Sequence, residues 1–336
     1  MRNDRILLSH GSGGKLSYQL VQNIFVKAFQ NEYLLPLNDQ AIFNLPASRI
    51  AFTTDSYVIH PIFFPGGDIG KLSVCGTIND LAVGGADPLF LSASFIIEEG
   101  LLVEELKAVV DSMSLTANNA GVKIITGDTK VVERGKGDKL FINTCGIGII
   151  HNNVNLSPSF IRPGDVIIVS GSVGDHGIAI LAHRSDIRME APIESDCAAL
   201  HRLVKDVISQ SNGIRAMRDP TRGGLATTLN ELAISSNLGM LINELNIPLK
   251  EEVKGACEIL GFDPLYLANE GKLIAIVSED SAKTVLETMK KNPLGRNASI
   301  IGTVIREPQG KVFLETSVGN KRILDMLSGE QLPRIC

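Results

Sequence analysis

Short apolar runs and amphipathic stretches follow one another along the chain, and this alternation predicts layers of helices and strands. Residues 16–30 show the period of an amphipathic helix, with Leu20, Ile24 and Ala28 on one stripe. Residues 49–54 form a short apolar run that predicts a strand ending at Asp55. Further along, the pattern predicts helices over 68–83 and 102–120, and strands over 89–97, 122–125 and 140–150.

A polar, turn-rich segment at 151–159 interrupts this pattern and indicates a linker. After it, the run at 166–169 predicts a buried strand, and alternating elements continue to about residue 305. Residues after 316 are charged and have no second apolar face, so we expect a tail there. The predicted organisation is an N-terminal domain over 1–152, a C-terminal domain over 153–316 and a tail over 317–336 that carries Cys336.

Composition fits this picture of α/β and α+β layers. The 336 residues correspond to two domains, or one large one, at about 150 residues each. With 44% hydrophobic and 21% charged residues, the chain can bury cores and is not disordered. A net charge of −5 argues against non-specific binding of nucleic acid. Neither a run of 18 apolar residues nor a secretory signal is found, so we expect a cytoplasmic protein without a membrane span.

The five cysteines are dispersed, which excludes CxxC motifs and zinc ribbons and indicates reduced thiols. Cys75, Cys145, Cys197 and Cys257 stand in apolar surroundings and are interpreted as small buried residues. Cys336 differs because it is the last residue of the chain.

A glycine-rich segment, His10-Gly-Ser-Gly-Gly-Lys-Leu16, precedes the first predicted helix. It is not a Walker A loop, because Ser9 and Leu16 stand where that motif needs glycine and Ser or Thr. Its free backbone N–H groups and Lys15 would nevertheless suit an anion at a helix N-terminus. A polyphosphate-binding segment and a flexible N-terminal arm both remain open.

Aspartates at predicted loop or element-end positions give a stronger signal. Each one alone is best explained as a helix cap or a turn residue. Several of them near glycines favour Mg²⁺ with a polyphosphate, because Mg²⁺ prefers oxygen ligands. His176 is interpreted as structural, whereas Glu270, before Gly271 and a buried strand, is expected at a sheet edge facing a cleft. The aspartates are Asp39, Asp55, Asp68, Asp80, Asp128 and Asp219.

Taken together, these motifs resemble a known ATP-binding superfamily that contains aminoimidazole ribonucleotide synthetase, selenophosphate synthetase and thiamine-monophosphate kinase. Within it, the chain resembles the HypE family of [NiFe]-hydrogenase maturation factors over nearly its whole length. The ending Pro333-Arg-Ile-Cys336 is the most specific feature. The other matching motifs are Asp39, Thr54-Asp55, Asn79-Asp80, Gly127-Asp128 and Asp219-Pro-Thr-Arg-Gly-Gly224.

The resemblance implies a two-domain fold of the aminoimidazole ribonucleotide synthetase type, whose N-terminal ATP-binding domain dimerises through its sheet. ATP and Mg²⁺ would lie between the domains, near the dimer interface. Asp39, Asp55, Asp80 and Asp219 match metal-ligand positions, and Asp128 is included with them as a further candidate. The candidate nucleotide-binding residues are Gly11, Ser12, Gly13, Gly14, Lys15, Asp68, Gly127 and Thr129.

The same resemblance implies a reaction on the protein's own terminus. A HypF-type carbamoyltransferase would load a carbamoyl group on Cys336, ATP would drive its dehydration to a thiocyanate, and a HypC–HypD complex would accept the cyano group. Lys130 and Glu270 match residues that assist proton removal. Residues 324–336 reach up to about 43 Å when extended, enough to enter a cleft and to swing out.

Three alternatives remain at this point. Selenophosphate synthetase fits less well, because its glycine-rich segment typically carries a reactive Cys or selenocysteine, which is missing here. A small-molecule kinase or synthetase of the same superfamily would not need the terminal cysteine. A non-enzymatic carrier would use ATP only to position the tail.

Overall fold

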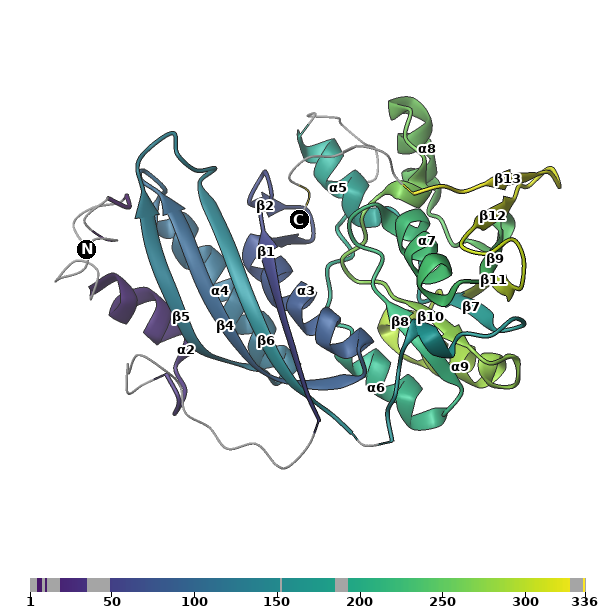
Figure 1. The fold of residues 1–336 in the computed structure, drawn as a ribbon. Helices are drawn as coiled ribbons and strands as arrows, with labels where there is room; N and C mark the ends of the chain where they lie inside the picture. The colour runs from purple at the N-terminus through teal and green to yellow at the C-terminus, as the bar shows by residue number, and fades with distance from the viewer. Residues whose placement is uncertain are drawn as a thin grey trace.

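A computed structural model describes residues 5–7, 10, 19–34, 49–151, 153–184, 193–326 and 335 (Figure 1). A π-helical turn at Val21–Val26 leads into α2 (Lys27–Phe29), so the predicted first helix is present over its described part. The other elements of this half are β1 (Arg49–Tyr57), β2 (Phe63–Phe64), β3 (Gly67–Asp68), α3 (Ile69–Val83), β4 (Ala86–Glu98), α4 (Val103–Ala120), β5 (Lys123–Val132) and β6 (Leu140–Ile150).

The N-terminal half contains a four-stranded sheet, and its described helices cover one face. Its strand order is β1-β6-β4-β5, and only the β4–β5 pair is parallel. Helices α3 and α4 lie behind the sheet in Figure 1 and bury its inner face. On β1 the side chains alternate, so Tyr57 is buried whereas Ile50 and Phe52 are 54% and 68% exposed on the open face.

The C-terminal half contains a seven-stranded sheet with helices on both faces. The strand order is β13-β12-β9-β11-β7-β10-β8, and all pairs except β9–β12 are antiparallel. The elements are β7 (Val166–Val169), α5 (Asp175–Arg184), α6 (His201–Gln210), β8 (Ile214–Arg218), α7 (Gly224–Ser236), β9 (Gly239–Asn243), α8 (Glu251–Leu260), β10 (Ile274–Val277), α9 (Glu279–Lys291), β11 (Ser299–Ile305), β12 (Val312–Glu315) and β13 (Lys321–Ile323).

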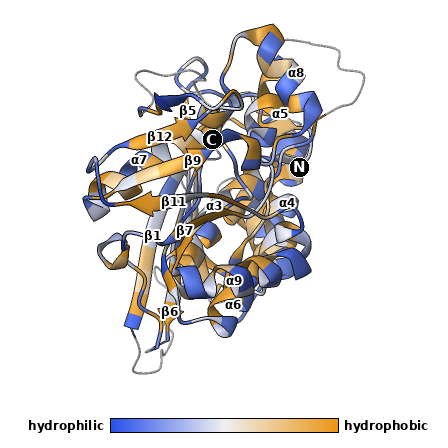
Figure 2. Cartoon of the chain, turned by 90° about the vertical axis from the view of Figure 1, so that its right-hand side faces the viewer, coloured by the Kyte–Doolittle hydropathy of each residue, from blue (hydrophilic) through white to orange (hydrophobic). Residues whose placement is uncertain are grey.

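Strand β7 shows why its sequence is apolar without alternation. Ile167 and Val169 pack in the core under α7, whereas Val166 and Ile168 pack in the core under α6 and α9. A strand that is covered on both faces needs apolar residues at every position. Figure 2 shows the same arrangement, with strands β9, β11 and β12 hydrophobic and the outer faces of α6 and α9 hydrophilic.

The predicted elements are present, but several run further than the sequence analysis expected. Asp55 lies inside β1, Asp80 lies inside α3, and Asp128 lies inside β5, so none of the three is at an element end. The pairing of β1 with β6 and of β5 with β4 explains the extra strand length, because ladder hydrogen bonds from a neighbour outweigh weak local propensity.

Part of the segment expected to be a tail, residues 317–336, belongs to the C-terminal sheet instead. Residues 321–323 form β13 at the edge of the C-terminal sheet, and Leu324 is fully buried in the core under α7. The local pattern did not predict this strand because all three of its residues are exposed, so it shows no apolar alternation. Within the described ranges, no helix combines the length and apolar character that crossing a bilayer requires.

Candidate active site

Three aspartates from three different elements interact at the boundary between the two halves. Asp55 is on β1, Asp80 is on α3, and Asp219 follows β8. Asp55 is aligned with Thr144 on β6, so the two side chains share a face of the sheet. Thr144 is buried, and its hydroxyl lies 2.5 Å from that of Thr77 on α3, so Asp55 points toward α3. Thr53 on β1 donates a hydrogen bond of 2.9 Å to Oδ2 of Asp80. The strand and the helix therefore present their carboxylates to the same space.

The cluster of Asp55, Asp80 and Asp219 carries negative charge that its surroundings compensate poorly. Burial, followed by the charges of Asp80 and Asp55, raises the pKa of Asp219 from its ordinary value to about 7. Burial and the charge of Asp55 also raise the pKa of Asp80. Arg222 approaches Asp55 at 3.8 Å, but its side chain is 70% exposed, so the attraction is weak.

Glu270 adds a fourth carboxyl group close to this cluster. Its side chain is 3% exposed, and its Oε1 has no hydrogen-bond partner among the residues that the structure describes. Burial raises the pKa of Glu270 well above its ordinary value, and the charges of Asp196 and Asp219 add to the shift. The backbone around it is fixed, because the Asp196 carboxylate accepts hydrogen bonds from Glu270 N at 3.0 Å and Gly271 N at 3.3 Å. A buried acid without a partner indicates that its partner is a substrate or a cation.

The donor set fits a magnesium ion shared with a phosphate. Among the described residues, no three His, Cys, Asp or Glu side chains stand close enough to enclose a metal ion by themselves. Mg²⁺ usually keeps several waters and takes one or two carboxylates plus phosphate oxygens, so a complete protein cage is not required. The raised pKa values of Asp80 and Asp219 show that a cation would stabilise their charged forms.

Asp128 and Lys130 do not join this cluster within one chain. In the sheet register, Asp128 is aligned with Ser94, Asn143 and Ser56, and Lys130 follows two residues later. Aligned residues share a face, and this is the open face, opposite the one on which Asp55 meets α3. Both side chains are exposed. The structure therefore separates these two residues from Asp55, Asp80 and Glu270 by the thickness of the sheet.

The remaining predicted residues have varied surroundings. Oδ1 of Asp68 caps α3 by accepting hydrogen bonds from the N–H groups of Gly70 and Lys71. Gly127 lies where a β-carbon would stand 2.2 Å from the carbonyl oxygen of Ala93, and Thr129 is two residues further on β5. Seven predicted residues lie outside the described residues: Gly11, Ser12, Gly13, Gly14, Lys15, Asp39 and Cys336.

The end of the chain docks beside this site. Ile335 is 6% exposed and belongs to the core cluster that includes Ile180, Cys197 and Ala268. Its carbonyl oxygen lies 2.8 Å from Nε2 of His176, a fully buried residue in the first turn of α5. His176 was interpreted from the sequence as structural, and its contact with the penultimate residue was not predicted.

Sequence reasoning also missed two residues that hold the backbone of Glu270, one of which, Asn79, joins the two halves. The side chain of Asn79 donates to the carbonyl oxygens of Ala198 and Glu270 and accepts from Leu200 N, at 3.0, 3.3 and 2.8 Å. Asp196 holds Lys272 in addition to the Glu270 backbone. A buried amide in the apolar helix α3 was the available signal for Asn79, whereas nothing around Asp196 in the sequence marked it.

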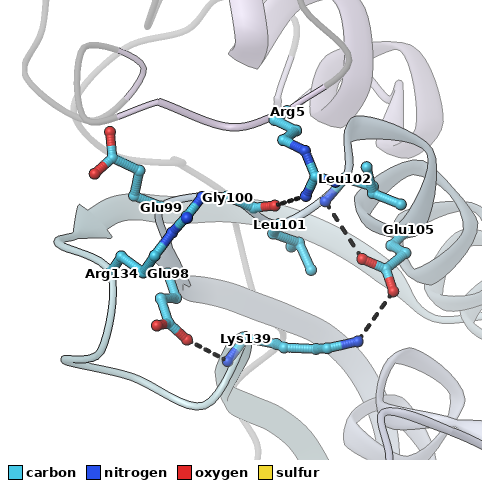
Figure 3. A pocket seen from close by; sticks show the side chains of 9 residues that line it. All are labelled: Arg5, Glu98, Glu99, Gly100, Leu101, Leu102, Glu105, Arg134 and Lys139. Atoms are coloured by element: carbon cyan, nitrogen blue, oxygen red, sulfur yellow. Dashed lines mark hydrogen bonds and ion pairs between the residues drawn. The ribbon is translucent and has the colours of Figure 1, made fainter.

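A separate polar pocket lies at the far end of the N-terminal sheet (Figure 3). Its volume is about 630 Å³ and its lining includes Arg5, Glu98, Glu105, Arg134 and Lys139. Several of these charged groups have partners within the pocket. Lys139 pairs with Glu105 at 3.2 Å, and the Glu98 carboxylate accepts hydrogen bonds from the N–H groups of Gly135 and Lys139. The pocket thus lacks the uncompensated charge of the acidic cluster.

The two sheets and the acidic cluster between them belong to a chain of the AIR synthase related family. Residues 37–150 match the family model "AIR synthase related protein, N-terminal domain", and residues 162–315 match the corresponding C-terminal domain. The chain is similar at the level of fold to thiamine monophosphate kinase from Aquifex aeolicus, with a TM-score of 0.63, 19% identity, and coverage of 92% and 99% of the two chains.

Closer relatives narrow this class to a single family. The chain is 53% identical to carbamoyl dehydratase HypE of Rhizobium leguminosarum bv. viciae over 99% of its own length and 96% of that protein. It is 48% identical to carbamoyl dehydratase HypE of Escherichia coli strain K12, covering 99% and 100% of the two proteins. The chain belongs to the HypE family.

Solved structures agree with this assignment. The hydrogenase maturation protein HypE in complex with ATP matches with a TM-score of 0.95 and 48% identity, covering 98% of this chain and 99% of that one. The structure of a HypE–HypF complex matches with a TM-score of 0.81 and 47% identity, covering 92% and 99%. The expected family and fold class are confirmed.

Proposed function

We propose that this protein is an ATP-dependent carbamoyl dehydratase that converts an S-carbamoyl group on Cys336 to S-cyanocysteine. The observation that carries the proposal is the docking of Ile335, the neighbour of Cys336, in a core cluster that includes Ala268, two residues before Glu270. The buried Oε1 of Glu270 has no hydrogen-bond partner among the described residues. Full-length relatives named carbamoyl dehydratase and a relative solved with ATP support it. The product would supply cyanide ligands for the iron of [NiFe]-hydrogenase.

ATP and Mg²⁺ would bind between the acidic cluster and the glycine-rich segment. Asp55, Asp80 and Asp219 would hold the metal, with Asp39 and Asp128 as the further ligands proposed from the sequence. When bound, the magnesium ion neutralises charge on the phosphoryl group that ATP supplies. Gly11 to Lys15, with Asp68, Gly127 and Thr129, remain the proposed nucleotide-binding residues.

The chemistry turns a poor leaving group into a good one. The carboxamide oxygen attacks the γ-phosphorus, the bond to the bridging oxygen breaks, and ADP leaves. The nitrogen then loses both protons, its electron pairs form the C≡N bond, and the C–O bond breaks with release of phosphate. The net change is loss of one water from the thiocarboxamide, with the elements of that water appearing in phosphate and a proton.

Glu270 is the proposed base for the nitrogen protons. Burial makes its carboxylate a stronger base than an exposed glutamate, because protonation relieves the cost of holding a charge away from water. Lys130 would stabilise the anion or relay the proton. Because Lys130 lies on the open face of the sheet, it would reach a Glu270 only across an interface with a second copy of the chain.

A homodimer through the open sheet face would provide that interface. The exposed apolar side chains Ile50, Phe52 and Ile96 lie on this face, and covering them would be favourable. Each site would then combine the acidic cluster and Glu270 of one chain with Asp128 and Lys130 of its partner chain. Such a two-fold arrangement uses the same patch on both copies.

The proposed partners follow from the route of the carbamoyl group. A HypF-type carbamoyltransferase would load Cys336, in keeping with the relative solved in a HypE–HypF complex. A HypC–HypD complex would accept the cyano group. All of these steps suit the cytoplasm, the compartment expected from the dispersed cysteines.

The mass of the intact protein tests this function. After loading by a HypF-type carbamoyltransferase, the protein is incubated with MgATP, and we expect loss of one water at Cys336 with release of one ADP. Cys336→Ser should show neither the adduct nor the loss, whereas Cys145→Ser, on the open sheet face, should retain both. An adduct that stays unchanged with MgATP contradicts the proposal.

A further inference from the structure

The contact between His176 and Ile335 joins the residue before Cys336 to helix α5 of the C-terminal half. His176 is fully buried, and Phe64 packs edge-on against its ring with the centroids 5.6 Å apart. Its Nε2 lies 2.8 Å from the carbonyl oxygen of Ile335, and its Nδ1 lies 2.8 Å from Oγ of Ser195. Both ring nitrogens therefore have a partner.

The hydrogen-bond partners determine which nitrogen carries the proton. Burial lowers the pKa of His176, so the ring is neutral and has one donor and one acceptor nitrogen. Ser195 Oγ accepts from Cys197 N at 3.1 Å, which leaves its single proton for Nδ1 of His176. The carbonyl oxygen of Ile335 can only accept, so the proton is on Nε2 and is donated to it.

The same short segment also fixes Glu270. Within residues 195–198, Ser195 orients His176, Asp196 accepts from Glu270 N, and Ala198 N donates to the carbonyl oxygen of Glu270 at 3.4 Å. The first turn of α5 is tied to the residues before Glu270 as well, because Gly177 N donates to Ala268 O at 3.1 Å and Gly174 N to Asn269 Oδ1 at 2.8 Å. His176 and Glu270 are thus held on one scaffold.

The carbonyl group that His176 contacts belongs to the peptide bond that leads into Cys336. Consecutive Cα atoms are about 3.8 Å apart, so fixing this carbonyl limits where the next residue can lie. The buried side chain of Ile335 supplies the second point of attachment. Two attachments, one apolar and one directional, are enough to set the direction in which the chain leaves residue 335.

We propose that His176 is a positioning residue that donates from Nε2 to the Ile335 carbonyl, with Ser195 selecting the tautomer, and so presents the substrate group on Cys336 to Glu270. The inference rests on the proposed function, and it names the residue that holds the end of the chain in the site. It predicts that the site recognises the backbone of the last peptide bond and an aliphatic residue before the cysteine.

The test compares four variants of the full chain. His176→Phe keeps an aromatic ring against Phe64 but has no donor, and Ser195→Ala removes the tautomer selection. His176→Gln restores an N–H donor, and His183→Phe, an exposed position on the last turn of α5, is the matched control. For carbamoylated protein at saturating MgATP, we expect His176→Phe to slow water loss about threefold to tenfold, the effect of one hydrogen bond to docking. The affinity of His176→Phe for ATP should stay unchanged. The rate of water loss in Ser195→Ala should lie between those of wild type and His176→Phe, and His176→Gln should recover part of the wild-type rate. His183→Phe should lose water at the wild-type rate.

Release of Cys336 by carboxypeptidase provides a readout that does not depend on the reaction. We expect His176→Phe to lose Cys336 faster than wild type by a similar factor, and His176→Gln to be protected again. If folded His176→Phe protein loses water and releases Cys336 at the wild-type rates, the inference is overturned. If that variant does not fold, release of Cys336 from Ser195→Ala at the wild-type rate would overturn it. Should wild-type protein fail to lose water, the proposed function fails, while the protease measurement still decides whether His176 holds the tail.

Discussion

Within the described part of the chain, the Oε1 atom of Glu270 has no hydrogen-bond partner, although its side chain is almost completely buried. Leaving a buried polar atom unpaired costs about 1–3 kcal/mol, so its presence points to a role in which a partner arrives later. The backbone of Glu270 is held by Asp196 and Asn79, so the carboxyl group cannot easily move away. This combination suits a base that acts on a docked substrate.

Replacing Glu270 by Gln separates binding of ATP from removal of the nitrogen protons. Glu270→Gln should still bind ATP, yet form thiocyanate at least about 100-fold more slowly, because the amide cannot accept the proton. Intact mass over time measures the product, and Glu258→Gln, exposed on α8, is the control. Wild-type product formation by Glu270→Gln would reject the base role.

The raised pKa of Asp219 predicts how the stability of the metal-free protein depends on pH. The ordinary value is 3.8 and the folded value is about 7, so between them the unfolded chain releases a proton that the folded chain keeps. Stability therefore falls as pH rises and levels off above about pH 7. Between about pH 6 and pH 8, wild type should lose about 1 kcal/mol more unfolding free energy than Asp219→Asn. Urea unfolding at both pH values checks this, and equal losses would remove Asp219 from the buried cluster.

At the scale of elements, strand β5 carries four of the proposed functional residues, Gly127 to Lys130, and depends on a close approach to β4. A β-carbon at Gly127 would stand 2.2 Å from the carbonyl oxygen of Ala93. Glycine at this position is thus required by packing between the strands. The Gly-Asp-Thr motif combines a packing residue, the exposed Asp128 and the half-buried Thr129 on a single strand.

Gly127→Ala should push β5 away from β4 and lower the unfolding free energy by about 1–3 kcal/mol, as overpacked sites do. Urea denaturation measures the change. Gly255→Ala in α8 is the matched control, because a β-carbon there meets no atom within 4 Å, and alanine in a helix interior should stabilise slightly. A neutral Gly127→Ala would show that β5 can shift without cost.

At the scale of the whole molecule, one chain does not bring all of the proposed residues together. The acidic cluster lies on the helix-covered side of the N-terminal sheet, whereas Asp128 and Lys130 lie on the open side. Under the proposal, a complete site would therefore combine residues of two copies of the chain. The apolar open face, with Phe52 68% exposed, is the surface that would join them.

Co-expression of Lys130→Ala and Glu270→Gln chains tests this sharing. Each homodimer should be inactive, but a heterodimer would contain one intact site, so random pairing should restore about a quarter of wild-type thiocyanate formation. Adding Phe52→Glu to both chains should abolish the recovery, whereas Ile259→Glu, on an exposed position of α8, should leave it. Lack of recovery in a confirmed heterodimer would place Lys130 and Glu270 in the same chain's site.

Much of the fold could be predicted, because helix and strand periods are local properties of the chain. The strands 140–150 and 166–169 were predicted with the bounds that the structure has, and α3 and α4 within one residue. The longer reach of β1 and β5 and the presence of β13 were not, because each depends on a neighbouring strand far away in the sequence.

The sequence by itself determined which segments form helices and strands, where the acidic and glycine motifs lie, and which family these motifs resemble. Only the tertiary structure decided which carboxylates share a space, which face of β5 carries Lys130, and that His176 meets Ile335 across 159 positions of the chain. The physical reason is that periodicity and turn chemistry act between near neighbours. Burial, charge coupling and tautomer choice, by contrast, arise only when distant segments are packed against each other.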